Sequence, residues 1–132
     1  MNKSIFRAYD IRGKYPDEIN EQAVYEISSG LSRFFKMGKV VVAHDARLSS
    51  PCLYREVLKG FSVNKGIKLI KVGFATTPMF YFLVGKLKAK GGVVVTASHN
   101  PKEWNGLKVV GKGAKMISGK EVLKILQKPG YE

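Results

Sequence analysis

Apolar residues along this chain recur at two alternating spacings. In some stretches they lie three and four residues apart, as on one face of a helix, and in others they form short continuous runs, as in buried strands. Helices are predicted at 20–35, 50–61, 77–87 and 122–127, and strands at 40–43, 67–72, 91–96 and 106–110. This alternation predicts an α/β fold: a single three-layer domain over 1–132 with a mainly parallel (mixed) β-sheet and helices on both faces.

Polar residues mark the predicted helix starts. Asn20 is suited to cap the first helix, and Ser50 before a proline predicts the start of the second. Thr77, also before a proline, repeats this pattern, and Ser118 with Glu121 predicts a capping box for the last helix. The first helix is expected to bury one apolar face, formed by Val24, Ile27, Leu31 and Phe34.

Composition narrows the class of protein. The 132 residues are 45% hydrophobic and 25% charged, which is typical of a folded domain. No apolar run approaches the ~20 residues of a membrane helix, and the first residues contain no apolar signal-peptide region. The single cysteine, Cys52, excludes an internal disulfide and a cysteine-based metal site, and we expect it to be buried and structural. A cytoplasmic protein with no membrane partner is therefore expected.

The charge balance is unusual, with 23 Lys and Arg against 10 Asp and Glu, a net charge of +13. Nucleic acid is the first partner that such a balance suggests. The lysines are spread along the chain, however, with no run of five, no RNA-binding aromatic signature and no zinc-finger spacing, so no nucleic-acid partner is expected. We interpret the charge as a solvated lysine-rich surface. Two alternatives are a field that attracts a small anionic substrate and a surface that faces an acidic partner.

Residues 96–101 carry the strongest candidate chemistry. Ser98 follows a run of valines, and the Asn-Pro pair after it excludes helix and predicts a tight turn, which would place the hydroxyl in the crevice at the strand end. These residues alone leave three interpretations of Ser98 open: it caps a turn, it acts as a nucleophile, or it carries a phosphate. A Ser-His-Asp hydrolase is disfavoured, because only two histidines are present and His99 is adjacent in sequence. A phosphate needs cations and donors around it, for which His99, Asn100 and Lys108 are the candidates.

Three motifs resemble those of the α-D-phosphohexomutases. Residues 96–101, together with Asn-Gly-Leu-Lys at 105–108, are similar to the active-site signature of that family. Phe-Arg-Ala-Tyr-Asp-Ile-Arg-Gly at 6–13 resembles the N-terminal motif of the phosphomannomutase/phosphoglucomutase branch, and residues 45–51 resemble its D-x-R-x-S-x-P segment. The resemblance covers essentially the whole chain and only the first domain of the family. It implies a phosphohexomutase domain I-like fold, with domains II–IV absent.

The resemblance implies catalytic roles for three residues. Ser98 would be the phosphoserine that donates its phosphoryl group to a sugar phosphate, and its phosphate would also be a ligand of Mg²⁺. His99 would lie beside the phosphoserine as a hydrogen-bond donor or acid/base group. Lys108 would neutralise charge near the phosphate and assist proton transfer.

For the sugar phosphate, the resemblance implies three binding residues. Arg12 would hold phosphoryl oxygen atoms through its planar guanidinium group. Tyr9 would line the sugar site, and Asn100, which is also expected to order the turn, would contact the substrate. Beside these residues, Asp45 and Arg47 are interpreted as a structural pair that supports the loops.

Parts of the family pattern are missing. The acidic D-G-D-x-D-R metal loop of domain II has no counterpart in a chain with three aspartates, and the recognition loops of domains III and IV are also missing. We therefore expect that the chain alone is inactive in interconverting hexose 6-phosphate and hexose 1-phosphate through a bisphosphorylated sugar. The implied cofactors are Mg²⁺, which needs the missing loop, and glucose or mannose bisphosphate as activator. The implied partners are a hexose phosphate and the remaining mutase domains or a complementary chain. The alternative is a non-catalytic split or relic domain that binds a partner chain or a phosphosugar.

Overall fold

The computed structural model describes residues 1–128. Its helices are α1 (Glu21–Phe35), α2 (Ser50–Phe61), α3 (Thr77–Lys86) and α4 (Gly119–Gln127), with short 3-10 helices η1 (Lys3–Ile5) and η2 (Lys112–Ala114). Its strands are β1 (Ile11–Lys14), β2 (Gly38–His44), β3 (Ile67–Phe74), β4 (Gly91–Val95), β5 (Trp104–Val110) and β6 (Met116–Ile117). Within this part of the chain, no helix combines the length and the apolar character needed to cross a membrane.

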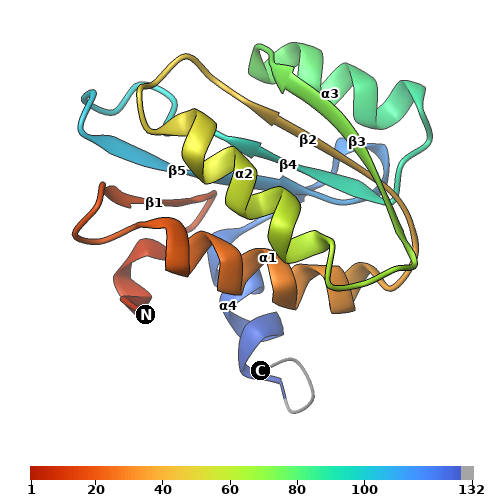
Figure 1. Cartoon of the computed structure of the whole chain (residues 1–132), viewed down its shortest axis with the longest axis horizontal. Coiled ribbons are helices and arrows are strands. Elements are labelled where there is room, and N and C mark those ends of the chain that lie inside the picture. The colour runs from red at the N-terminus through yellow and green to blue at the C-terminus, as the bar shows by residue number, and fades with distance from the viewer. Residues whose placement is uncertain (129–132) are drawn as a thin grey trace.

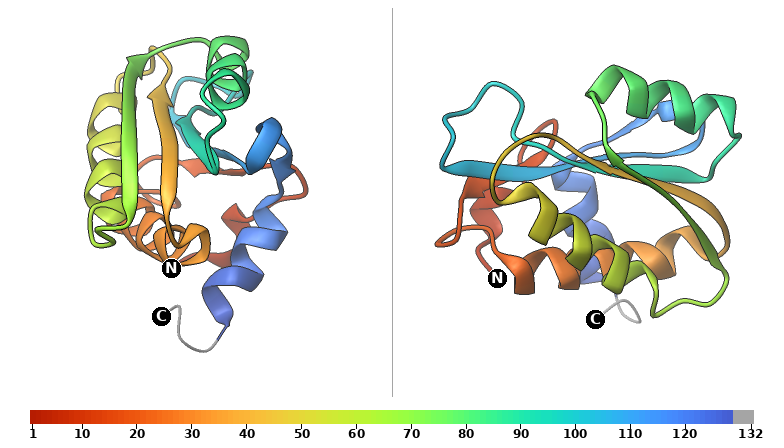
Figure 2. Two further views of the ribbon diagram at one scale, coloured as in Figure 1. Left: turned by 90° about the vertical axis from the view of Figure 1, so that its right-hand side faces the viewer. Right: turned by 45° about the horizontal axis from the view of Figure 1, so that its top comes forward.

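The strands form one mixed sheet in the order β1-β5-β4-β2-β3, with β6 beside β5. β2 pairs in parallel with β3 and β4, whereas β5 is antiparallel to β1, β4 and β6. Helices α2 and α3 lie on opposite sides of the sheet (Figure 1; Figure 2, left). The predicted three-layer α/β fold with a mixed sheet is confirmed.

Two apolar cores fill the spaces between the layers. The larger core lies on the sheet face covered by α1, α2 and α4, and the smaller on the face covered by α3. Val40 and Val42 of β2 belong to the larger core, whereas Val41 and Ala43 belong to the smaller, because successive strand residues face opposite sides. This two-sided burial explains why the strand reads as a continuous apolar run rather than as an alternating one.

Helices α1 and α4 have the N-caps that the sequence predicts, although α4 starts at Gly119 rather than at the predicted Val122. The Asn20 side chain accepts a hydrogen bond at the start of α1, and both bonds of the Ser118–Glu121 capping box are present. The predicted apolar face of α1 is wrong at its last position, since Phe34 is 38% exposed and Phe35 only 6%. Phe35 continues the buried stripe because its ring stacks on Phe61 of α2, 6.3 Å away between centroids.

Helices α2 and α3 have their N-caps one residue before the predicted ones. Ser49 holds the N-cap position of α2, and the predicted cap, Ser50, instead donates its hydroxyl to the carboxylate of Asp45 at 2.5 Å. In α3 the cap is Thr76 rather than Thr77. Each proline therefore lies within the first helical turn rather than immediately after the N-cap, where its missing N–H is still tolerated.

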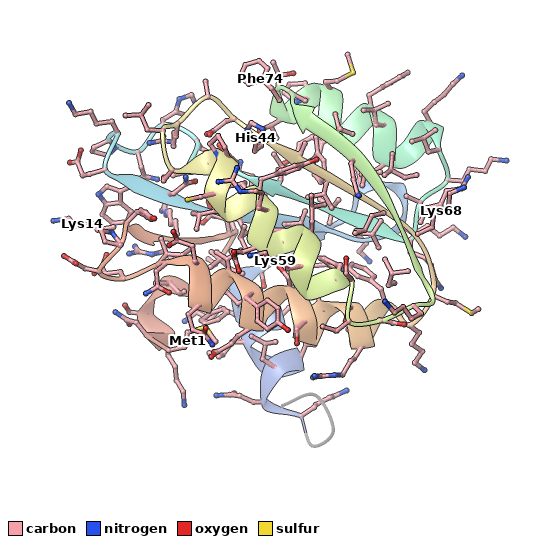
Figure 3. All side chains as sticks on the ribbon, viewed as in Figure 1. Met1, Lys14, His44, Lys59, Lys68 and Phe74 are labelled. Carbon is pink, nitrogen blue, oxygen red and sulfur yellow. The ribbon has the colours of Figure 1, made fainter. Side chains whose placement is uncertain are left out.

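The carboxyl ends of β2, β3 and β4 meet at one edge of the sheet. His44 and Phe74 end β2 and β3 there with their rings 6.3 Å apart, whereas Lys68 marks the opposite end of β3 (Figure 3). Because β5 runs antiparallel to β4, its first residue, Trp104, returns to the same edge. The loop between β4 and β5, cyan in Figure 1, and the yellow-orange loop after β2 both lie at this edge. Open α/β sheets bind ligands outside the carboxyl ends of their parallel strands.

Candidate active site

The loop after β4 presents Ser98 to solvent, as the sequence predicts. Ser98 adopts a positive φ of 54°, a left-handed conformation that costs a non-glycine residue about 1–2 kcal/mol. Its N–H donates to Thr96 Oγ1 at 3.0 Å. The turn is closed by Asn100, whose N–H and side-chain amide both donate to the carbonyl oxygen of Ala97, at 3.1 and 2.9 Å. Asn100 therefore orders the turn; its contact with substrate stays a prediction.

Arg47, in the loop after β2, binds the loop between β4 and β5 (residues 96–103), which we call the serine loop. Its side chain is 13% exposed, and its Nε lies 3.3 Å from Asp45 Oδ2, which confirms the predicted structural pair. The guanidinium group also donates to four backbone carbonyl oxygens, three of the serine loop and one of Trp104, the first residue of β5. The acceptors are Ser98 (2.9 Å), Asn100 (2.8 Å), Pro101 (2.7 Å) and Trp104 (3.2 Å). The pair thus supports the one loop that carries the candidate phosphoserine.

A buried polar network, not predicted from the sequence, ties the same loops to β5. The Asn105 side chain donates to Ser49 Oγ at 2.7 Å and to Ser50 Oγ at 3.0 Å, and Ser50 donates in turn to Asp45. The side-chain oxygen Oδ1 of Asn105 accepts from the N–H of Gly106 at 2.8 Å. Asn105 is fully buried, so these bonds satisfy a polar group that water does not reach. The sequence signal for this network was the position of Asn105 in the second part of the active-site motif, residues 105–108.

Three cationic side chains lie beside successive positions of β5. Strand pairing places Arg12 opposite Gly106 and Lys108 opposite Val94, a residue of the α3-side core. Residues two apart on a strand face the same side of the sheet, so Gly106 and Lys108 lie on one face. Because Lys108 is opposite Val94, this is the face covered by α3. Arg7, to which the sequence analysis gave no role, lies over the ring of Trp104 at 5.5 Å. Arg7, Arg12 and Lys108 therefore follow one another along β5.

The serine loop is adjacent to this row of cations. The N–H of Thr96 donates to the carbonyl oxygen of Gly106 at 2.9 Å, which places the start of the loop level with Arg12. Arg12 Nε lies 3.6 Å from Asp10, and the Nε atoms of Arg7 and Arg12 are buried without a hydrogen-bond partner among the described residues. Fixed positive groups beside an exposed hydroxyl suit a site that binds phosphate.

Two predicted site residues are exposed on the loops that border the candidate site. Tyr9 precedes β1 and is 72% exposed, and His99 follows Ser98 at the turn. Their contacts with a sugar and with a phosphate stay predictions. The other histidine, His44, is packed: its Nδ1 lies 2.7 Å from the carbonyl oxygen of Asp45, and its ring meets that of Tyr54 at 4.9 Å. Burial raises the pKa of the Tyr54 hydroxyl, although donation from the Gly73 N–H opposes the rise.

A second polar cluster lies where α1 and α2 begin. The Tyr15 hydroxyl donates to Glu21 Oε2 at 2.8 Å and is 3.7 Å from Cys52 Sγ. The bond to Glu21, together with burial, raises the pKa of Tyr15, and the same bond lowers the pKa of Glu21. Cys52 was expected to be buried; it is half-buried and donates to the carbonyl oxygen of Ser49 at 3.1 Å.

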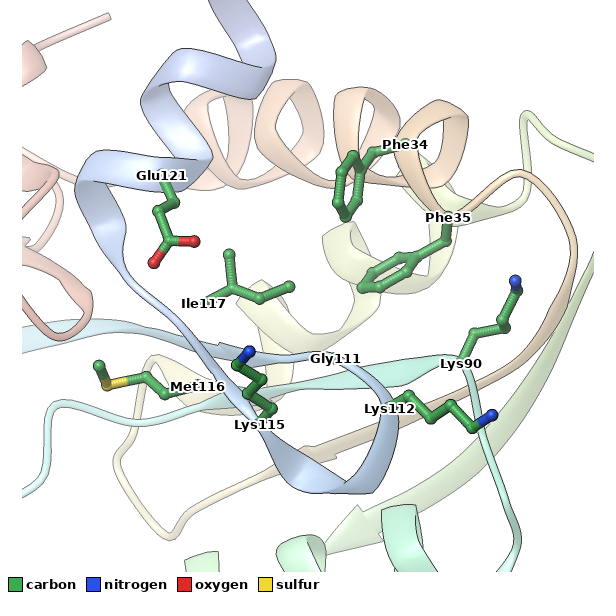
Figure 4. A pocket seen from close by; sticks show the side chains of 9 residues that line it. All are labelled: Phe34, Phe35, Lys90, Gly111, Lys112, Lys115, Met116, Ile117 and Glu121. Atoms are coloured by element: carbon green, nitrogen blue, oxygen red, sulfur yellow. The ribbon is translucent and has the colours of Figure 1, made fainter.

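No group of three or more His, Cys, Asp or Glu side chains comes together among residues 1–128. A hollow of about 450 Å³ between the end of α1 and the segment from η2 to β6 contains none of the predicted site residues (Figure 4). It is lined by apolar side chains, including Phe34 and Ile117, and by Lys90, Lys112 and Lys115. This hollow is therefore separate from the candidate site around Ser98.

Known proteins are similar to this chain in sequence and in fold. Residues 3–129 match the family described as phosphoglucomutase/phosphomannomutase, alpha/beta/alpha domain I. The chain is 44% identical over 118 residues to phosphohexose mutases of Xanthomonas campestris, covering 89% of this chain and 26% of that protein. It is 41% identical over 127 residues to an Escherichia coli phosphomannomutase, covering 96% of this chain and 28% of that protein.

A solved structure agrees with these relatives. A phosphoglucomutase/phosphomannomutase family protein from Burkholderia thailandensis superposes with a TM-score of 0.82 at 30% identity, over 96% of this chain and 30% of that one. The chain thus spans between a quarter and a third of the length of these relatives. On its sequence and its fold, the chain belongs to the phosphoglucomutase/phosphomannomutase family, of which it represents the alpha/beta/alpha domain I.

Proposed function

We propose that this domain carries the phosphoserine of a hexose phosphate mutase, with Ser98 as the phosphorylated residue. The observation that supports the proposal best is the position of Ser98, exposed on a loop whose carbonyl groups are bound by Arg47 and which lies next to the cations along β5. A phosphate on Ser98 has a charge of about −1.5 to −2 at pH 7, which Arg7, Arg12 and Lys108 would partly neutralise.

In the proposed reaction, a hydroxyl oxygen of a hexose monophosphate attacks the phosphorus on Ser98. The new O–P bond forms at the sugar, and the attacking hydroxyl passes its proton to a nearby base. The bond between phosphorus and Ser98 Oγ breaks, and Ser98 Oγ takes up a proton from a nearby acid. His99 and Lys108 are the candidates for these acid and base roles. The resulting bisphosphate reorients and returns its other phosphoryl group to Ser98. Phosphate thereby moves between C6 and C1, and glucose or mannose bisphosphate acts as the activator that keeps Ser98 phosphorylated.

The proposal divides the site between this domain and parts outside it. Mg²⁺ would stabilise charge on the transferred phosphoryl group, and the phosphate of Ser98 is the ligand that this domain would supply. Residues 1–128 bring no group of three or more His, Cys, Asp or Glu side chains together. The carboxylates and the grip on the distant phosphate would come from the remaining mutase domains or a complementary chain. We therefore propose that the 132 residues alone accept a phosphoryl group without sustained turnover. A cytoplasmic location stays a prediction.

The test measures the two parts of this proposal separately: the uptake of a phosphoryl group and the absence of sustained turnover. The chain is incubated with α-D-glucose 1,6-bisphosphate and Mg²⁺ for intact-mass measurement, and separately with glucose 1-phosphate in an assay for glucose 6-phosphate. A full-length phosphomannomutase serves as the positive control. We expect the uptake of one phosphoryl group and no sustained formation of glucose 6-phosphate. An unphosphorylated chain under all conditions contradicts the proposal and favours the alternative of a non-catalytic domain that binds a partner chain or a phosphosugar.

A further inference from the structure

We propose that Arg47 is a positioning residue, which holds Ser98 in its left-handed conformation and so aims the hydroxyl, without contacting substrate itself. The conformational part of this proposal stands on the geometry of the two loops. Its consequence for phosphoryl transfer rests on the proposed function of Ser98.

Every donor of the Arg47 guanidinium group is already occupied. The group has five N–H donors and no acceptor. Nη1 donates to Pro101 and Trp104, Nη2 donates to Ser98 and Asn100, and Nε pairs with Asp45. A phosphate oxygen could be bound only if a bond to the loop were given up, so the geometry assigns Arg47 to the loop rather than to substrate.

The bonds from Arg47 act where the backbone of the loop is strained. Ser98 has a φ of 54°, which is sterically costly for a residue with a Cβ atom. Its N–H is held by Thr96, and its carbonyl oxygen is held by Arg47, so the peptide groups on both sides of Ser98 are fixed. The bonds to Asn100 and Pro101 fix the far side of the turn. Hydrogen bonds from a charged donor are stronger than neutral ones, which suits them to hold an unfavourable conformation.

Arg47 is itself held in place before it meets the loop. Asp45 pairs with Nε of Arg47 and accepts from both the backbone N–H of Arg47 and the hydroxyl of Ser50. Ser50 accepts in turn from buried Asn105 of β5. The guanidinium plane is therefore oriented by neighbours that do not belong to the serine loop. A lysine at this position has three donors on a flexible stem and lacks the planar fork, so it cannot reproduce the set of bonds.

The test compares the intact chain with Arg47→Ala, Arg47→Lys and Arg55→Ala, in which an exposed arginine of α2 is removed as a control for charge. The one-bond Cα–Hα coupling of Ser98, measured by NMR, distinguishes positive from negative φ. Intact mass gives the rate of phosphoryl uptake from α-D-glucose 1,6-bisphosphate. We expect Arg47→Ala to lose the coupling typical of positive φ and to slow uptake about 100-fold, as a small misplacement of a reacting group does. Arg47→Lys should lie between, and Arg55→Ala should match the parent chain.

Two results would overturn the proposal. One is a folded Arg47→Ala variant in which Ser98 keeps its positive φ, and the other is a lost positive φ with an unchanged rate of uptake. Thermal melting shows which variants are folded, and if Arg47→Ala is not, Arg47→Lys decides in its place. If the parent chain takes up no phosphate, the proposed function fails, whereas the coupling of Ser98 still decides whether Arg47 holds the loop.

Discussion

Arg12 lies directly opposite Gly106 in the antiparallel pairing of β1 with β5, and a Cβ atom at position 106 would overlap the carbonyl oxygen of Ile11. It would also come within 2.9 and 3.0 Å of the Cα and Cβ atoms of Arg12. The glycine of the active-site motif is therefore explained by the close approach of β1. That approach brings Arg12 level with the start of the serine loop.

Gly106→Ala is expected to destabilise the domain by about 1–3 kcal/mol, because backbone atoms must move to admit the methyl group. Chemical denaturation measures the free energy of unfolding. The matched control is Gly85→Ala, since Gly85 is an exposed glycine of α3 with no atom within 4 Å of its added Cβ. That change should stabilise the domain by about 0.5–1 kcal/mol. Equal effects of the two substitutions would contradict the explanation of Gly106 by the close approach of β1.

Ser50→Ala is expected to cost about 1–3 kcal/mol, because it leaves one donor of buried Asn105 without a partner and removes one of the two hydrogen bonds that Asp45 Oδ1 accepts. Ser62→Ala removes an exposed hydroxyl at the end of α2 and should change the free energy of unfolding by no more than about 0.5 kcal/mol. If both variants are equally stable in urea, the polar network under the site does not contribute to stability.

Phe35→Ala and Phe34→Ala test the corrected apolar face of α1. Phe35 is 6% exposed and stacks on Phe61, so its truncation should cost about 3–5 kcal/mol. Phe34 is 38% exposed and meets Phe35 edge-on, so its truncation should cost less. The melting temperatures of the two variants give the order, and the reverse order would restore the face predicted from the sequence.

Tyr15→Phe should change how stability depends on pH. The Tyr15 hydroxyl lowers the folded-state pKa of Glu21 below its ordinary 4.5, so this bond contributes stability above pH 4.5 that is lost as the pH falls through the folded-state pKa. The difference in unfolding free energy between the parent chain and Tyr15→Phe should therefore be larger at neutral pH than in acid. The raised pKa of Tyr15 also destabilises the parent fold above its ordinary 10.0, an alkaline loss that the variant should not show. Tyr25→Phe, on α1, is the control, and a pH-independent difference would argue against the bond.

Local sequence was enough to predict the elements with strong apolar patterns, and not enough for β1. Val40 to Ala43 lie in a strand buried on both faces because the run itself requires burial. In β1 only Ile11 is large and apolar, and the strand forms because Gly106, far along the chain, lets it approach β5. The same division applies to the helix caps: Asn20 acts within its own turn, whereas Ser50 is diverted to Asp45 and Asn105 by tertiary packing.

The candidate site shows the same limit. The exposed turn at Ser98 follows from the Asn-Pro pair beside it, which is local information. The bonds from Arg47 cross more than 50 residues, and the position of Arg7 over Trp104 depends on two segments from opposite ends of the chain. Periodicity does not encode such contacts, so the sequence predicted the pair of Arg47 with Asp45 and left the acceptors of Arg47 beyond that pair unknown.

The measurement that bears most directly on the function of this domain is the location of phosphate after incubation with α-D-glucose 1,6-bisphosphate and Mg²⁺. Tandem mass spectrometry of the digested chain should find a single phosphoryl group on Ser98. It should be lost in Ser98→Ala and kept in Ser62→Ala, which removes an exposed hydroxyl remote from the site motifs. A phosphate on another residue, or uptake that persists in Ser98→Ala, would contradict the assignment of Ser98 as the phosphorylated residue.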